Sequence, residues 1–136
     1  MPSDIDPSRR PLKSRATAWA QALAGFLVVR RVSPNAISVM GILFALLGAA
    51  GMFAVTLGYV HPALGLLIGA AGVQLRLLCN LMDGLVAVEG KLKSKAGILF
   101  NEAPDRLQDA ILLVGAGFVC GHPQLGWGFA ALALVT

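Results

Sequence analysis

Apolar residues in this chain gather in long runs that are separated by short polar or charged segments. Residues 36–60 contain no ionisable side chain, and a run of this length can cross a hydrocarbon core about 30 Å thick. A second run covers 62–88, a third covers 96–120, and a fourth begins near Leu125. The pattern predicts an all-α protein, a polytopic bundle of transmembrane helices. Because the fourth run stops at Thr136, too early to cross, we expect the N-terminal portion of a larger bundle.

The composition favours a membrane protein over a water-soluble one. Hydrophobic residues make up 57% of the chain and charged residues 13%, and the mean hydropathy is +0.75. So few charges cannot cover a water-soluble globule of 136 residues. Residues 36–136 are therefore expected to hold transmembrane helices 1–3 and the start of helix 4.

Residues 1–35 have a different character, because they carry six of the eleven basic residues. Within them, 17–32 combines apolar residues at helical spacing with basic residues at both ends. This predicts a cytoplasmic basic tail followed by an interfacial amphipathic helix, with an ordinary solvated tail as the alternative.

Three lysines within 91–95 would lie on the same side of the membrane as the basic tail if the first two spans form a hairpin, and the 58–62 turn carries no charge. The positive-inside rule then predicts an integral membrane protein whose N-terminus lies in the cytoplasm. If the source is bacterial, the membrane is the inner or plasma membrane. No nucleic-acid partner is expected.

The acidic residues are concentrated in one part of the chain. Five of the seven lie within 83–109, between two apolar stretches: Asp83, Glu89, Glu102, Asp105 and Asp109. Carboxylates near the ends of membrane spans are costly unless they bind a cation or a substrate. We therefore expect a functional site here, at the cytoplasmic face.

Helical geometry gathers the polar residues onto two faces, one on each of two consecutive spans. The first face carries Arg76, Asn80, Asp83, Gly84 and Ala87, and the second carries Gly97, Asn101, Glu102, Asp105, Gln108 and Asp109. We expect these faces to look at each other across a shared cavity. Oxygen ligands without a nearby His or Cys pair suit Mg²⁺, Mn²⁺ or Ca²⁺ and argue against zinc.

The spacing of these residues resembles the signature of the CDP-alcohol phosphotransferases. That signature reads Asp, two residues, Asp-Gly, two residues, Ala-Arg, eight residues, Gly, three residues, Asp, three residues, Asp. Every interval agrees, and the identities match at Asp83, Gly84, Ala87, Gly97 and Asp105. Residues 33–38, Ser-Pro-Asn-Ala-Ile-Ser, are similar to the Thr-Pro-Asn-x-Ile-Thr element with which many of these enzymes enter their first span.

The resemblance implies a six-helix membrane transferase of phospholipid biosynthesis. Such an enzyme moves a phosphatidyl or other substituted phosphate group from a CDP-alcohol, such as CDP-diacylglycerol, to an acceptor alcohol and releases CMP. Its partners are these substrates and membrane lipids, and family members are commonly homodimers. By resemblance, Mg²⁺ or Mn²⁺ would be held by Asn80, Asp83, Asn101 and Asp105. Asp105 would also be the catalytic base, and Gly84, Ala87, Gly97 and Arg76 would contact substrate.

Three positions depart from the signature: Asn80 and Asn101 replace aspartates, and Val88 replaces the arginine. Each asparagine removes a negative charge and weakens the hold on a divalent ion. Glu102 and Asp109 are candidates to restore that charge, or they pair with Arg106 or with lysines. Arg76 either takes over phosphate binding from the missing arginine or neutralises Asp83. A catalytically inactive member that serves as a lipid-binding, nucleotide-binding or scaffold protein is the alternative function, and a piece of a cation transporter is the third.

Two further features of the spans lead to predictions about packing. Gly41, Gly48 and Gly51 have the small-residue spacing of helix-packing glycines. Pro104 either kinks the third span or lies in the first turn of a helix capped by Asn101.

Overall fold

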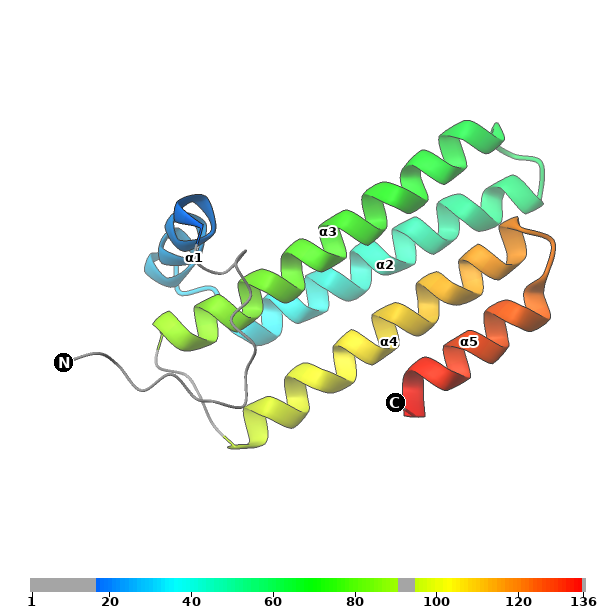
Figure 1. Cartoon of the computed structure of the whole chain (residues 1–136). Coiled ribbons are helices and arrows are strands. Elements are labelled where there is room, and N and C mark those ends of the chain that lie inside the picture. The colour runs from blue at the N-terminus through cyan, green and yellow to red at the C-terminus, as the bar shows by residue number, and fades with distance from the viewer. Residues whose placement is uncertain (1–16, 91–94, 136) are drawn as a thin grey trace.

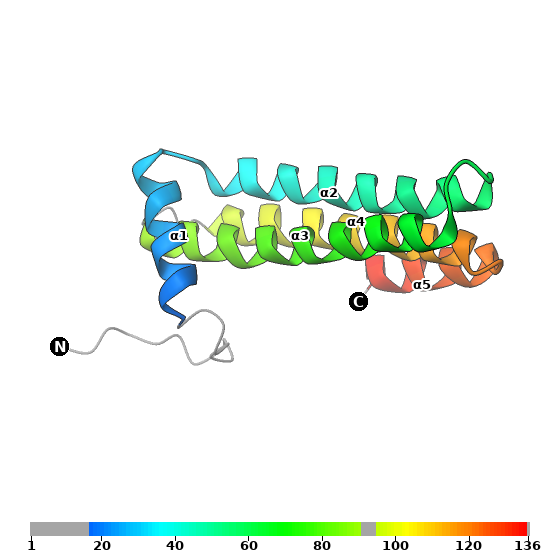
Figure 2. The same ribbon diagram turned by 90° about the horizontal axis from the view of Figure 1, so that it is seen from above.

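The computed structural model describes residues 17–90 and 95–135, with the side chains of 95–102 outside the described part. Every element in these ranges is a helix, which confirms the all-α prediction. The helices are α1 (Ala18–Val29), α2 (Pro34–Thr56), α3 (Pro62–Glu89), α4 (Lys95–Val119) and α5 (Pro123–Val135). Three of them, α2, α3 and α4, run side by side along most of their length, while α5 follows α4 and α1 crosses one end of the bundle (Figures 1 and 2).

Proline and glycine set where the helices begin and end. A proline occupies the first position of α2, α3 and α5, where its missing N–H breaks no helical hydrogen bond. Ser33 caps α2 by accepting a hydrogen bond from the backbone N–H of Ala36 at 3.2 Å. Gly58 after α2 and Gly121 after α4 have φ of 74° and 75°, a left-handed conformation that glycine adopts without strain. These stops explain why α2 ends at Thr56 rather than at residue 60.

Glycines let α2 and α3 approach until their backbones touch. A Cβ atom built on Gly48 would lie 3.2 Å from Gly72 Cα, and one built on Gly51 would lie 2.5 Å from Cγ2 of Ile68. In the other direction, a Cβ on Gly65 would lie 2.7 Å from the carbonyl oxygen of Gly51. The prediction that Gly48 and Gly51 serve helix packing is therefore confirmed, and dispersion contacts between the two backbones replace side-chain interdigitation.

Close packing of small residues also places α4 and α5. A Cβ on Gly115 of α4 would lie 2.9 Å from Ala49 Cα of α2, and one on Gly117 would lie 2.6 Å from Gly126 Cα of α5. Pro104 lies inside α4, so the alternative of a helix that begins near Asn101 is wrong.

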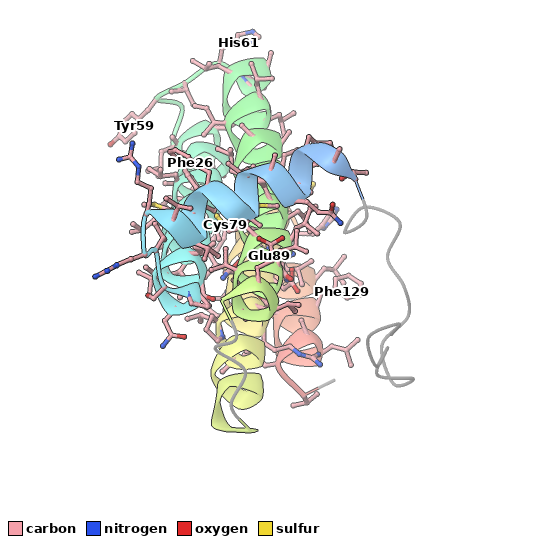
Figure 3. All side chains as sticks on the ribbon, turned by 90° about the vertical axis from the view of Figure 1, so that its left-hand side faces the viewer. Phe26, Tyr59, His61, Cys79, Glu89 and Phe129 are labelled. Carbon is pink, nitrogen blue, oxygen red and sulfur yellow. The ribbon has the colours of Figure 1, made fainter. Side chains whose placement is uncertain are left out.

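Helix α1 packs on the end of α3 through two alanines. Ala20 and Ala24 are fully buried against a cluster that includes Met82 and Val86, while Trp19 and Phe26 remain more than half exposed. Figure 3 views this end directly and shows α1 crossing the bundle, with Phe26 labelled on it. Inside α1 the one polar side chain is a glutamine, and its basic neighbours lie beyond the C-terminal end at 30–31. The location of α1 at a membrane interface stays a prediction.

Two described helices, α2 and α3, can cross a membrane by length and composition. Only 39% and 22% of their most apolar segments are buried in the bundle, whereas a core helix of a soluble protein is mostly buried. Their outward faces carry large exposed side chains, among them Leu43, Leu47, Leu67 and Leu77. Helix α4 is not one of the two, and it carries four charged residues within 102–109. Its role as a third span, and the orientation of the chain, stay predictions.

Candidate functional site

The polar face of α3 points into the bundle. Arg76, Asn80 and Asp83 follow one another at intervals of four and three residues, so they share one side of the helix. Arg76 is 6% exposed and Asp83 is 1% exposed. Charged side chains are almost never buried to this extent unless they are paired, so each needs a partner on a neighbouring helix.

One partner of Asp83 comes from the start of α2. Ser38 donates a hydrogen bond from its hydroxyl Oγ to Oδ2 of Asp83 at 2.8 Å. Ser38 is itself 3% exposed, so this contact is shielded from solvent. A hydrogen bond to an ionised acceptor is shorter and stronger than one between neutral groups. The contact fixes the direction of the Asp83 carboxylate.

Helix α4 joins the same group through Gln108. Its Nε2 donates to the backbone carbonyl of Ser38 at 3.2 Å, and the side chain is 1% exposed. The amide lies over Gly41, where a Cβ atom would come within 2.9 Å of both its nitrogen and its oxygen. Gly41 was predicted to serve helix packing, and the structure shows that it makes room for this side chain from α4.

Arg76 forms a second link between α3 and α4. Its Nη2 lies 2.6 Å from Oδ1 of Asp109 in a salt bridge, and the same atom donates to the backbone carbonyl of Asp105 at 3.3 Å. The two side chains differ in exposure, 8% for Arg76 and 45% for Asp109. The cation therefore pairs with an acid on α4. Arg106, the other partner considered for Asp109, donates to the carbonyl of Ala133 on α5.

Asp105 is the point where the polar groups of α3 and α4 converge. The Asn80 amide donates a side-chain hydrogen bond to its carboxylate, and the charges of Asp83, Arg76 and Asp109 all act on it. Its Oδ1 is buried without a hydrogen-bond partner among the described residues. The carboxyl group of Asp105 thus lies within electrostatic reach of Asp83 and of the Arg76–Asp109 pair.

For the remaining predicted site residues, the structure shows at most how far each is buried. Gly84 and Ala87 are partly buried on α3, and Val88 is 48% exposed at the position of the missing arginine. The surroundings of Gly97 and the side chains of Asn101 and Glu102 lie outside the described part of the chain. Their predicted contacts with substrate or metal stay predictions.

The described part of the chain offers oxygen donors but no complete set of acidic ligands for a metal ion. No group of three His, Cys, Asp or Glu residues there could hold a metal ion. Asp83 and Asp105 supply carboxylates, and the carbonyl oxygen of Asn80 stays available because its amide nitrogen makes the bond to Asp105. Oxygens of this kind are the ligands that Mg²⁺ and Mn²⁺ prefer, and the buried Oδ1 of Asp105 has no hydrogen-bond partner among the described residues.

Two buried residues of the site, Ser38 and Gln108, had no role assigned from the sequence. Ser38 closes the Ser-Pro-Asn element, and Gln108 falls on the polar face of the third span. The sequence holds one weak indication for each: it is a polar residue on a helix face that is expected to point into the bundle. Their partners lie 45 and 70 positions away, which spacing along one helix cannot reveal.

No family model, no curated protein and no solved structure matches this chain. The resemblance to the CDP-alcohol phosphotransferases therefore stays a prediction from residues 33–38 and 80–105. What the site can do follows from its own geometry.

The two halves of the Arg76–Asp109 pair should differ in their effect on stability. Asp109→Asn leaves a guanidinium buried without its carboxylate, whereas Arg76→Met leaves a carboxylate that is nearly half exposed. We expect Asp109→Asn to lower the free energy of unfolding by about 3 kcal/mol and Arg76→Met by about half of that. Denaturant unfolding in detergent micelles measures both. The double variant should be more stable than Asp109→Asn alone, and the reverse order would contradict the burial of Arg76.

Proposed function

We propose that this protein is a membrane phosphotransferase of the CDP-alcohol type. It moves a phosphatidyl or other substituted phosphate group from a CDP-alcohol to an acceptor alcohol and releases CMP. The observation that supports the proposal is that Asp105 on α4 lies within electrostatic reach of Asn80 and Asp83 on α3. A resemblance based on spacing requires these residues to meet, although Asp83 and Asp105 lie on different helices.

Asp105 is suited to act as the base that deprotonates the acceptor alcohol. The Asn80 side chain donates a hydrogen bond to its carboxylate, and the buried Oδ1 has no partner among the described residues and can accept a proton. Asp83, with Oδ2 held by Ser38, is the second acidic oxygen donor. A divalent cation bound there would neutralise charge on the pyrophosphate and align the attacking and leaving oxygens.

Arg76 carries a positive charge that acts on Asp105. Its guanidinium binds Asp109 through Nη2, while Nε is buried without a partner among the described residues. We assign Arg76 first to neutralising Asp109 and second to contacting a substrate phosphate through Nε. Asp109 is consequently a poor replacement for a lost metal ligand, which leaves Glu102 as the other candidate.

The surroundings of the site suit a lipid substrate. The exposed apolar faces of α2 and α3 would lie against acyl chains, so a CDP-alcohol with lipid tails could reach the site from the bilayer. We propose further that the N-terminus and the site face the cytoplasm. Subunit pairing into a homodimer is compatible with this arrangement.

A catalytically inactive relative is the second candidate. Asn80 and Asn101 each lack the charge of an aspartate, and Asp109 is already neutralised by Arg76. Such a protein would bind a lipid or a nucleotide without transferring it.

The deciding experiment is CMP release by the full-length protein in micelles that contain a CDP-alcohol, an acceptor and Mn²⁺ or Mg²⁺. We expect release that depends on the cation and falls about 100-fold or more in Asp105→Asn, because a positioned base contributes at least that factor. Gln124→Glu, an exposed change at the start of α5, is the control and should have no effect. Absence of CMP release under either ion, with CDP-diacylglycerol as donor, would support the inactive relative.

A further inference from the structure

We propose that Ser38 and Gln108 are positioning residues that set the geometry of the cation site. They act through one hydrogen-bond chain, from Gln108 to the Ser38 backbone and from the Ser38 hydroxyl to Asp83. This inference rests on the proposed function, because it takes Asp83 as a cation ligand. It assigns a role to two residues that would not touch the cation themselves.

The Ser38 hydroxyl has one proton, and two acceptors among the described residues lie within its reach. The carbonyl of Pro34, four residues earlier in the same helix, is 3.2 Å away, and Oδ2 of Asp83 is 2.8 Å away. A serine inside a helix commonly bonds back to the preceding turn, but a carboxylate is the stronger acceptor. The shorter distance agrees with this preference, so the proton is directed at Asp83. The carboxylate is thereby fixed in one orientation.

Gln108 connects this contact to the second carboxylate. It follows Asp105 by three residues, so both side chains lie on the same side of α4. Its hydrogen bond to Ser38 joins α4 to α2, and the Ser38 hydroxyl joins α2 to α3. The distance between Asp83 on α3 and Asp105 on α4 therefore depends on Ser38, which belongs to the third helix, α2.

Burial makes the chain of contacts rigid. Ser38, Asp83 and Gln108 are 3%, 1% and 1% exposed, so water does not compete for these bonds. Gly41 leaves just enough room for the Gln108 amide, since a Cβ there would lie 2.9 Å from it. Partners that orient a metal ligand typically change metal affinity 10- to 100-fold when they are removed.

The test measures Mn²⁺ affinity of the full-length protein in micelles by electron paramagnetic resonance, without any substrate. We expect Ser38→Ala to weaken binding by about 10- to 100-fold, whereas Ser38→Thr, which keeps the hydroxyl, should stay within a few-fold of the parent. Gln108→Met keeps the length of the side chain but removes the donor, and it should weaken binding by a smaller factor. Its effect should shrink further when Ser38 is already alanine, because the two residues act in one chain.

Thermal unfolding in EDTA shows whether each variant is folded. If Ser38→Ala does not fold, Gln108→Met decides by the same affinity measurement. Parent-like Mn²⁺ binding in a folded Ser38→Ala, alongside loss of binding in Asp83→Asn, would overturn this inference and leave the proposed function intact. Equal losses in Ser38→Ala and Ser38→Thr would also overturn it. A parent that binds no Mn²⁺ would remove the cation site itself, and with it both proposals.

Discussion

Gly72→Ala should destabilise the bundle by about 3 kcal/mol or more, because overpacking against backbone atoms cannot be relieved by rotating a side chain. A Cβ atom at this position would lie 2.7 Å from Gly48 Cα and 2.8 Å from the carbonyl oxygen of Phe44. Helices α2 and α3 would have to move apart along their contact. Thermal unfolding in micelles, followed by circular dichroism, should show a clear drop in the melting temperature.

Gly128→Ala is the matched control, since it makes the same chemical change inside α5. No atom lies within 4 Å of a Cβ built there, so only the helix preference of alanine acts. We expect a stabilisation of about 0.5–1 kcal/mol. The same substitution should thus have opposite signs at two sites. A Gly72→Ala protein as stable as the parent would show that α2 and α3 do not touch through their backbones.

Asn80→Asp should have opposite effects on stability and on cation binding. Without a cation, the change replaces the amide that donates to Asp105 by a third carboxylate beside Asp83 and Asp105. Loss of the donor and repulsion between like charges should lower the free energy of unfolding by about 1–3 kcal/mol. With Mn²⁺ present, a carboxylate is the stronger ligand, and affinity should rise about tenfold, equivalent to about 1.4 kcal/mol.

The difference in melting temperature between Mn²⁺ and EDTA measures both effects at once. It should be larger for Asn80→Asp than for the parent, because a ligand that binds the folded state stabilises it more the tighter it binds, with the logarithm of its affinity. Equal destabilisation in Mn²⁺ and in EDTA would show that no cation binds beside residue 80. Gln124→Glu adds a carboxylate on the exposed start of α5 and should change neither value. CMP release should rise or hold in Asn80→Asp, whereas a fall would indicate a site rebuilt around other acids such as Glu102.

The helices could be predicted from the sequence because each depends on local information. Apolar runs placed four helices, and the ends moved only where local chemistry intervened, as at Pro34 and Gly58. The packing of Gly48 and Gly51 was likewise predicted from small residues repeated along one face. Helical periodicity also placed Asp83 and Asp105 on faces able to meet.

The partners within the site could not be predicted in the same way. Periodicity shows which side of a helix is polar, but not which residue of another helix lies opposite. Arg76 could pair with Asp83 on its own helix, yet the structure pairs it with Asp109, 33 positions further along the chain. Ser38 was seen as part of a motif at a helix start, although its hydroxyl reaches α3. Such contacts depend on how deeply α2 and α3 pack, which the glycines permit but do not specify.

The ion pair between Arg76 and Asp109 also bears on how the protein is assembled. Ser38 and Asp83 both belong to the α2–α3 hairpin, so that hairpin supplies a hydrogen bond to Oδ2 of its own buried carboxyl group. Arg76 cannot be satisfied there, because its counter-ion is carried by α4. If α3 crosses a bilayer, an arginine exposed in hydrocarbon is expensive. We therefore expect α3 to remain at the translocation machinery until α4 has been synthesised, so that the two helices enter the lipid together.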